Sequence, residues 1–169
     1  SIAKKTAGGA KKVIEKTTVT VNEVEYGFEK DVILSCEYSS VNTSEALSDN
    51  INNLMANAYG FYLDNEAAGK KTNATKVNIQ VTNKIKEYLE SAGEISGEIT
   101  LKIYETEEGM ELFLSENDVD VCTGGLVTVA KAIGETTEVE YKGEIVDISK
   151  KNTLRTGIVD CISLEAFAK

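Results

Sequence analysis

The chain has 169 residues, of which 41% are hydrophobic and 27% charged, a composition that excludes a disordered or collagen-like chain and is typical of a folded globular protein. It contains no histidine, which excludes every mechanism that needs an imidazole as a general base or metal ligand. The formal net charge is −10, but the first sixteen residues carry five lysines and one glutamate, so a basic N-terminal segment precedes a strongly acidic remainder.

The first part of the chain after this segment is typical of β-strands. Apolar and polar residues alternate over 19–21 and again over 24–28. The phase of this alternation changes at Asn22–Glu23, which predicts a tight hairpin at that point. Residues 31–38 continue the alternation and predict a further strand.

A principal helix is predicted over about residues 43–62. Asn42 is a suitable N-cap, and Glu45 stands three residues later, where it can complete a capping box. Apolar residues then recur at spacings of three and four, which predicts one buried helix face, formed by Leu47, Ile51, Leu54, Met55, Ala58 and Tyr62.

The second half of the chain is predicted to be mostly strand. A short helix over about 83–92, capped by Asn83, interrupts it. The expected strands and hairpins are a strand at 76–81, a hairpin over 100–115 that turns near Gly109, one or two strands over 118–134 with a kink at Gly124–Gly125, a hairpin that turns at Lys142–Gly143, and a last strand over 156–164.

These elements together predict an α+β protein that is mainly β. We expect an antiparallel β-sandwich or barrel of about eight to ten strands that carries the two helices. No linker or shift of composition divides the chain, so residues 17–169 are interpreted as a single globular domain that follows a basic arm over residues 1–16. In the order of its elements, the predicted fold resembles the tail-tube type of β-sandwich with one helix.

The basic arm is the main candidate interaction site. Its glycines and its scarcity of large apolar residues predict a segment outside the core, so that deletion of residues 1–12 is expected to leave the fold nearly unchanged. Its lysines are suited to an acidic partner, such as the acidic body of a neighbouring copy. The candidate residues are Lys4, Lys5, Lys11, Lys12 and Lys16.

Three cysteines, Cys36, Cys122 and Cys161, are widely separated and form no CxxC motif. This spacing is typical of reduced thiols that are buried as small hydrophobic residues. Cys36 and Cys161 are expected on strands, and Cys122 is expected to be the most exposed of the three.

The sequence indicates no catalytic residues, no metal site and no cofactor. The nucleotide-binding glycine motifs and the hydrolase nucleophile motif are absent. Glu116, Asp118 and Asp120 would share one face of a strand and could hold a hard cation, but the segment lacks the loop pattern of an EF-hand. An acidic strand edge that discourages pairing is the alternative interpretation.

We therefore expect a non-enzymatic structural subunit of a larger assembly, such as a virus or phage particle protein of the capsid-associated or tail-tube kind. Its partners would be copies of itself and other subunits, in the virion or in the cytoplasm of the host cell during assembly. Neither a membrane span nor an apolar secretory signal is visible, and contact with nucleic acid is expected only through the arm. The alternative hypothesis is an adaptor module that binds one protein partner.

Overall fold

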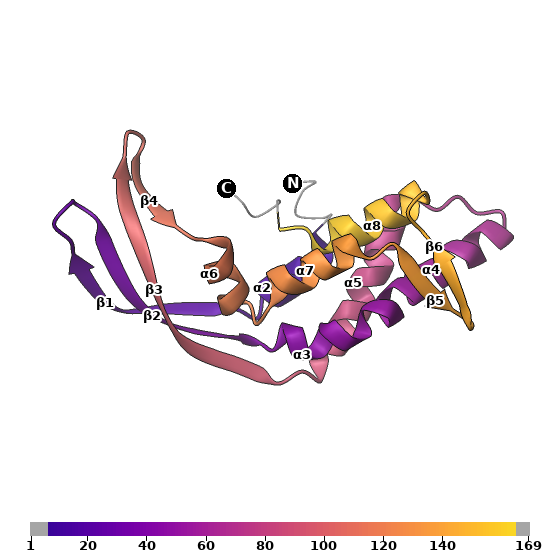
Figure 1. The fold of residues 1–169 in the computed structure, drawn as a ribbon, viewed down its shortest axis with the longest axis horizontal. Helices are drawn as coiled ribbons and strands as arrows, with labels where there is room; N and C mark the ends of the chain where they lie inside the picture. Colours follow the sequence, from indigo (N-terminus) through magenta and orange to yellow (C-terminus); the bar gives the residue numbers. More distant parts are fainter. Residues whose placement is uncertain (1–6, 165–169) are drawn as a thin grey trace.

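The computed structural model describes residues 7–164, which form a long curved sheet joined to a helical body (Figure 1). The sheet is antiparallel, and its strands in spatial order are β1 (Thr18–Tyr26), β2 (Val32–Val41), β3 (Glu94–Thr106) and β4 (Gly109–Phe113). A separate hairpin consists of β5 (Glu138–Tyr141) and β6 (Glu144–Asp147). The helices are α2 (Gly8–Ile14), α3 (Thr43–Leu47), the 3-10 turn η1 (Ser48–Asn50), α4 (Ile51–Ala67), α5 (Ala74–Glu90), α6 (Glu116–Cys122), α7 (Leu126–Glu135) and α8 (Asn152–Ile162).

The predicted β-sandwich or barrel is wrong. Over residues 7–164 the structure has one sheet of four strands and one of two strands, and helices make up the rest of the core. Three segments predicted as strands are helical: 76–81 belongs to α5, 118–134 forms most of α6 and α7, and 156–164 lies mostly in α8. The class α+β holds, but the balance between helix and strand does not.

Helix α5 shows why the alternation over 76–81 was misleading. Val77, Val81 and Ile85 recur every four residues and are buried, whereas Ile79 is 55% exposed. Residues 77, 79 and 81 therefore do not share a face, because the apolar period is that of a helix. The helix begins at Ala74, after Asn73 accepts a 2.9 Å hydrogen bond from the Lys76 N–H, so the predicted short helix over 83–92 is only its C-terminal half.

The predicted principal helix is confirmed at its start. The Asn42 side chain accepts a 3.2 Å hydrogen bond from the Glu45 N–H, and its own amide donates to Glu45 Oε2 at 2.9 Å. The 3-10 turn η1 then separates α3 from α4, which extends past residue 62 to Ala67. Four residues of the predicted inner face are fully buried: Leu47, Leu54, Met55 and Ala58.

Helix α5 is the centre of the helical body and packs against α2, α4 and α8 (Figure 1). The α5–α8 contact is close because α8 presents Gly157, where a Cβ atom would lie 2.5 Å from Val77 Cβ. The two helices can approach in this way only with a glycine at the crossing.

Two predicted hairpins are confirmed. β3 and β4 turn just before Gly109, which has a φ of 118°, and β5 and β6 turn at Lys142–Gly143 with φ values of 50° and 81°. Positive φ at both Lys142 and Gly143 is the geometry of a type I′ turn, whose twist matches that of the strands β5 and β6.

The predicted hairpin at Asn22–Glu23 is wrong, and β1 runs continuously through it. The register with β2 shifts between Val21 and Glu23, so the change of phase corresponds to a β-bulge. The actual turn follows Tyr26 and leads into β2 at Val32.

Candidate protein interface

The described part of the predicted basic arm contributes to the core. Within residues 7–16, Ala10 and Val13 of helix α2 and the preceding N-cap residue Ala7 are buried against the helical body. Deletion of residues 1–12 would therefore remove core contacts, contrary to the expectation from the sequence.

Three of the five lysines of the arm lie within the described residues. Lys11 and Lys12 lie 3.8 and 3.9 Å from the two carboxylate oxygens of Glu15, and Lys16 borders a shallow hollow beside Glu90. Lys4 and Lys5 lie outside the described residues. A role of these lysines in contacts with a partner stays a prediction.

The acidic triplet is not brought together as a site, because the segment is helical. Glu116 forms an ion pair with Lys131 at 3.0 Å, and Asp118 accepts a hydrogen bond from the Ser115 N–H in a capping box. Asp120 accepts hydrogen bonds from the N–H and hydroxyl of Thr128, at 2.9 and 2.7 Å. Each carboxylate thus stabilises a helix or helix junction, and residues 7–164 contain no cluster of three or more metal-ligating side chains.

All three cysteines are buried and free, which confirms their interpretation as small hydrophobic residues, although Cys161 lies in α8 and Cys122 in α6 and not on strands. Burial raises the pKa of the Cys36 and Cys122 thiols and raises that of Cys161 to about 11. Raised values leave the thiols protonated at neutral pH, the opposite of what a nucleophilic cysteine requires.

The four-stranded sheet has one apolar face, and its centre is covered. Cross-strand pairing places Leu34 beside Leu101 and Cys36 beside Ile99. Helix α6 lies over this centre, in the concave side of the sheet, and packs against β2 and β3 (Figure 1). Leu34, Cys36 and Leu101 are buried there and form a second hydrophobic cluster, separate from the main core.

The margins of the sheet are open. All nine residues of β1 and all five of β4 are exposed. Of the large hydrophobic side chains exposed in residues 7–164, all but Ile79 and Ile145 lie on the strands and turns of this sheet, just after β4 or on α6. They are Val19, Val21, Val24, Tyr26, Phe28, Tyr104, Met110, Leu112, Phe113, Leu114 and Val121. Tyr104 and Phe113 lie on the opposite face of the sheet, where their rings contact each other, because Ile103 and Leu112 form the apolar pair between β3 and β4.

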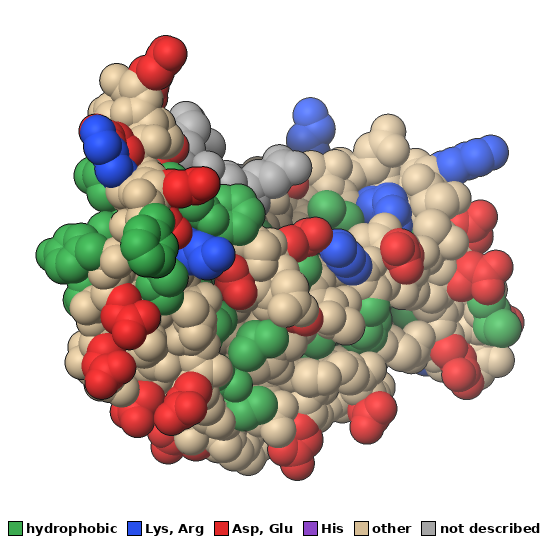
Figure 2. Space-filling model, turned by 60° about the vertical axis from the view of Figure 1, so that its left-hand side comes forward, with side chains coloured by type: hydrophobic (Ala, Val, Ile, Leu, Met, Phe, Trp, Pro, Cys, Tyr) green, Lys and Arg blue, Asp and Glu red, His purple; other side chains and the backbone are tan. Residues whose placement is uncertain are grey.

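Figure 2 shows hydrophobic side chains gathered at this end of the molecule, with acidic side chains around them. A concentrated apolar patch with a polar rim is typical of a protein interface, whereas scattered single hydrophobic residues need no explanation. We call the eleven residues named above the hairpin patch.

The two outer strands also expose backbone groups. β1 and β4 are the edges of the sheet, so one side of each is without a strand partner in residues 7–164. Neither strand contains a lysine or proline, but Glu23, Glu25 and the β-bulge of β1 are also features that limit pairing at an edge. A further strand on either edge must therefore accommodate these features.

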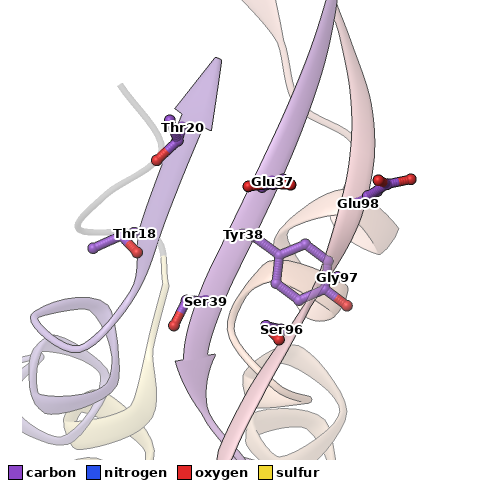
Figure 3. A pocket seen from close by; sticks show the side chains of 8 residues that line it. All are labelled: Thr18, Thr20, Glu37, Tyr38, Ser39, Ser96, Gly97 and Glu98. Atoms are coloured by element: carbon purple, nitrogen blue, oxygen red, sulfur yellow. The ribbon is translucent and has the colours of Figure 1, made fainter. Parts of the chain in front are cut away.

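The opposite face of the sheet is polar over residues 18–20, 37–39 and 96–98. A hollow of about 350 Å³ lies there between β1 and the strands beside it, and Figure 3 shows Thr18 and Thr20 on one side and Glu98 on the other. Its lining combines hydroxyl groups with the carboxylates of Glu37 and Glu98. The Tyr38 ring covers Gly97, its partner on β3, on the other face of the sheet, the side of Cys36 and Ile99.

Comparison with protein-family models, with curated proteins and with solved structures found no match. None of the helices in residues 7–164 has both the length and the hydropathy needed to cross a membrane. The function must therefore be argued from the chain's own geometry.

The hairpin patch was only half visible in the sequence. The alternating apolar residues of β1 are plain, but alternation indicates a face without saying whether another layer covers it. The exposure of this face depends on the position of α6, and most of that segment was predicted to be a strand.

Proposed function

We propose that this chain is a non-enzymatic structural subunit that associates with copies of itself in a larger assembly. The observation that carries the proposal is the hairpin patch, whose exposed apolar side chains lie mainly on one face of the sheet, beside two open strand edges. Burial of such a face stabilises association by about 25 cal/mol for each Å² of apolar surface removed from water.

The structure removes the reason for one of the assemblies that the sequence suggested. A tail-tube subunit was inferred from the order of elements in a sandwich, and that fold is wrong. A virus or phage particle, in the virion or in the host cytoplasm, stays a prediction and rests on the combination of a basic segment with an acidic body.

The proposal predicts that removing aromatic side chains from the hairpin patch weakens self-association. Tyr26 and Phe28 are 84% and 110% exposed, and aromatic residues often dominate the energy of an interface. We expect the double variant Tyr26→Ser, Phe28→Ser to raise the dissociation constant about tenfold or more, measured by sedimentation equilibrium.

The matched control is Ile145→Ser. Ile145 is 74% exposed, but it lies on β6, outside the hairpin patch. Its replacement should leave the dissociation constant unchanged. A wild-type chain that stays monomeric at every concentration would contradict self-association and favour an adaptor that binds a different protein.

A further inference from the structure

The outer edge of β1 is the longest open strand edge in residues 7–164. Its nine residues extend from Thr18 to Tyr26, whereas β4 has five. A partner strand on β1 could thus form nearly twice as many backbone hydrogen bonds as one on β4.

The β-bulge gives β1 an internal symmetry. Before the bulge, odd-numbered residues lie on the apolar face, and after it even-numbered residues do, because Val21 pairs with Cys36 and Val24 with Leu34. The apolar row of the strand is Val19, Val21, Val24 and Tyr26, whose positions are symmetric about the step between residues 22 and 23.

We propose that β1 pairs antiparallel with β1 of a second copy, about a two-fold axis between residues 22 and 23. In this register Val21 lies opposite Val24 of the copy, and Val19 lies opposite its Tyr26. Residues directly opposite in an antiparallel pair share a face, so the two apolar rows become continuous. The inference rests on the proposed function and specifies its interface.

The charges of β1 fit the same register. Glu25 lies opposite Thr20 of the copy, and Glu23 lies opposite its Asn22, so no carboxylate lies directly opposite another, and the two copies of Glu23 are neighbours at the axis. This matters because like charges directly opposite each other destabilise a strand pair. A shift by two residues in either direction leaves an apolar residue of the row opposite a polar one: Val21 opposite Asn22, or Val24 opposite Glu23.

Pairing of β1 with β4 of another copy would be shorter, because β4 has only five residues. The alignment that places Tyr26 against Met110 also places Glu25 opposite Glu111. The two-fold pairing avoids this repulsion, uses the whole length of β1 and joins two four-stranded sheets into one with both apolar faces on the same side. Such an interface is closed, in contrast to the open chains that head-to-tail contacts produce.

The register can be tested with complementary charges. Val21→Lys and Val24→Glu each place a charge opposite a valine, so each variant alone should be about tenfold weaker in self-association. In a dimer of one chain of each variant, the new lysine at position 21 lies opposite the new glutamate at position 24. At the second crossing, Val24 of the first chain lies opposite Val21 of the other. We therefore expect the mixture, and neither variant alone, to recover dimers by sedimentation velocity.

The control is Val19→Lys mixed with Val19→Glu, which should not recover dimers because the two copies of residue 19 lie at opposite ends of the interface in this register. Val19, Val21 and Val24 are 44%, 47% and 49% exposed, so variants at all three positions should fold, as circular dichroism can verify. Recovery of dimers by the control mixture would overturn the register.

A second measurement uses exposed polar positions. A mixture of Thr20→Cys and Glu25→Cys chains should form a disulfide between copies, since opposite residues of an antiparallel pair have Cα atoms about 4.5–5.5 Å apart. Thr20→Cys mixed with Glu23→Cys should not. A wild-type chain that self-associates without either signal would refute the β1 pairing and leave the proposed function standing, whereas a monomeric wild-type chain would refute the proposed function.

Discussion

Leu54→Ala is expected to lower the free energy of unfolding by about 2–5 kcal/mol. Leu54 is 1% exposed and lies on the inner face of α4, in the main core. The substitution removes buried apolar surface and leaves a cavity that rigid neighbours fill only in part. Chemical denaturation of the two proteins measures the difference.

Asn53→Ala is the matched control for this prediction. Asn53 is the preceding residue of α4, but its side chain is exposed and donates one long hydrogen bond, 3.3 Å, to Asn50. Its replacement should change stability by less than about 0.5 kcal/mol. Equal losses at the two positions would contradict the orientation of α4.

Gly124→Ala is expected to cost about 2–5 kcal/mol, for two separate reasons. Gly124 has a φ of 68°, a conformation that alanine adopts only with strain. In addition, a Cβ atom here would overlap the Val41 carbonyl oxygen and lie 3.1 Å from the Thr43 backbone nitrogen. The substitution would push the α6–α7 junction away from the end of β2.

Gly69→Ala separates these two causes. Gly69 has nearly the same φ, 70°, but a Cβ atom there would have no neighbour within 4 Å. We therefore expect only the conformational cost, about 1–2 kcal/mol. If thermal or chemical unfolding showed the same loss for both variants, the close contact between Gly124 and β2 would be contradicted.

The sequence was informative where local chemistry determines the structure. The turn at Lys142–Gly143 follows from Gly143, which tolerates positive φ, and the helix start at Asn42 follows from its side-chain cap. Such features depend on neighbours within a few residues. Both were therefore predicted in the right place.

Short apolar runs misled the prediction because two periods fit them. Val77, Ile79 and Val81 alternate like a strand, but Val77 and Val81 also stand four residues apart on a helix. The same ambiguity affects α8, where Leu154, Ile158 and Cys161 are buried at spacings of four and three. Only the continuation of the pattern over a whole helix distinguishes the two.

The candidate interface depends on tertiary structure in a way that no local pattern records. The alternation around Asn22 is compatible with a turn or with a bulge, and only pairing with β2 decides between them. Likewise, Cys36 is buried and Val21 beside it is 47% exposed, because α6 covers the centre of the sheet and leaves its margin open.

The most direct test of self-association through the β1 edge is backbone hydrogen exchange of the wild-type chain at increasing protein concentration. Amides of an open edge strand exchange readily, and those that enter a new strand pair are protected. We predict that protection over residues 18–26 rises with concentration, while that of β6 stays constant. If the chain self-associates and exchange over residues 18–26 does not change, association through β1 is contradicted.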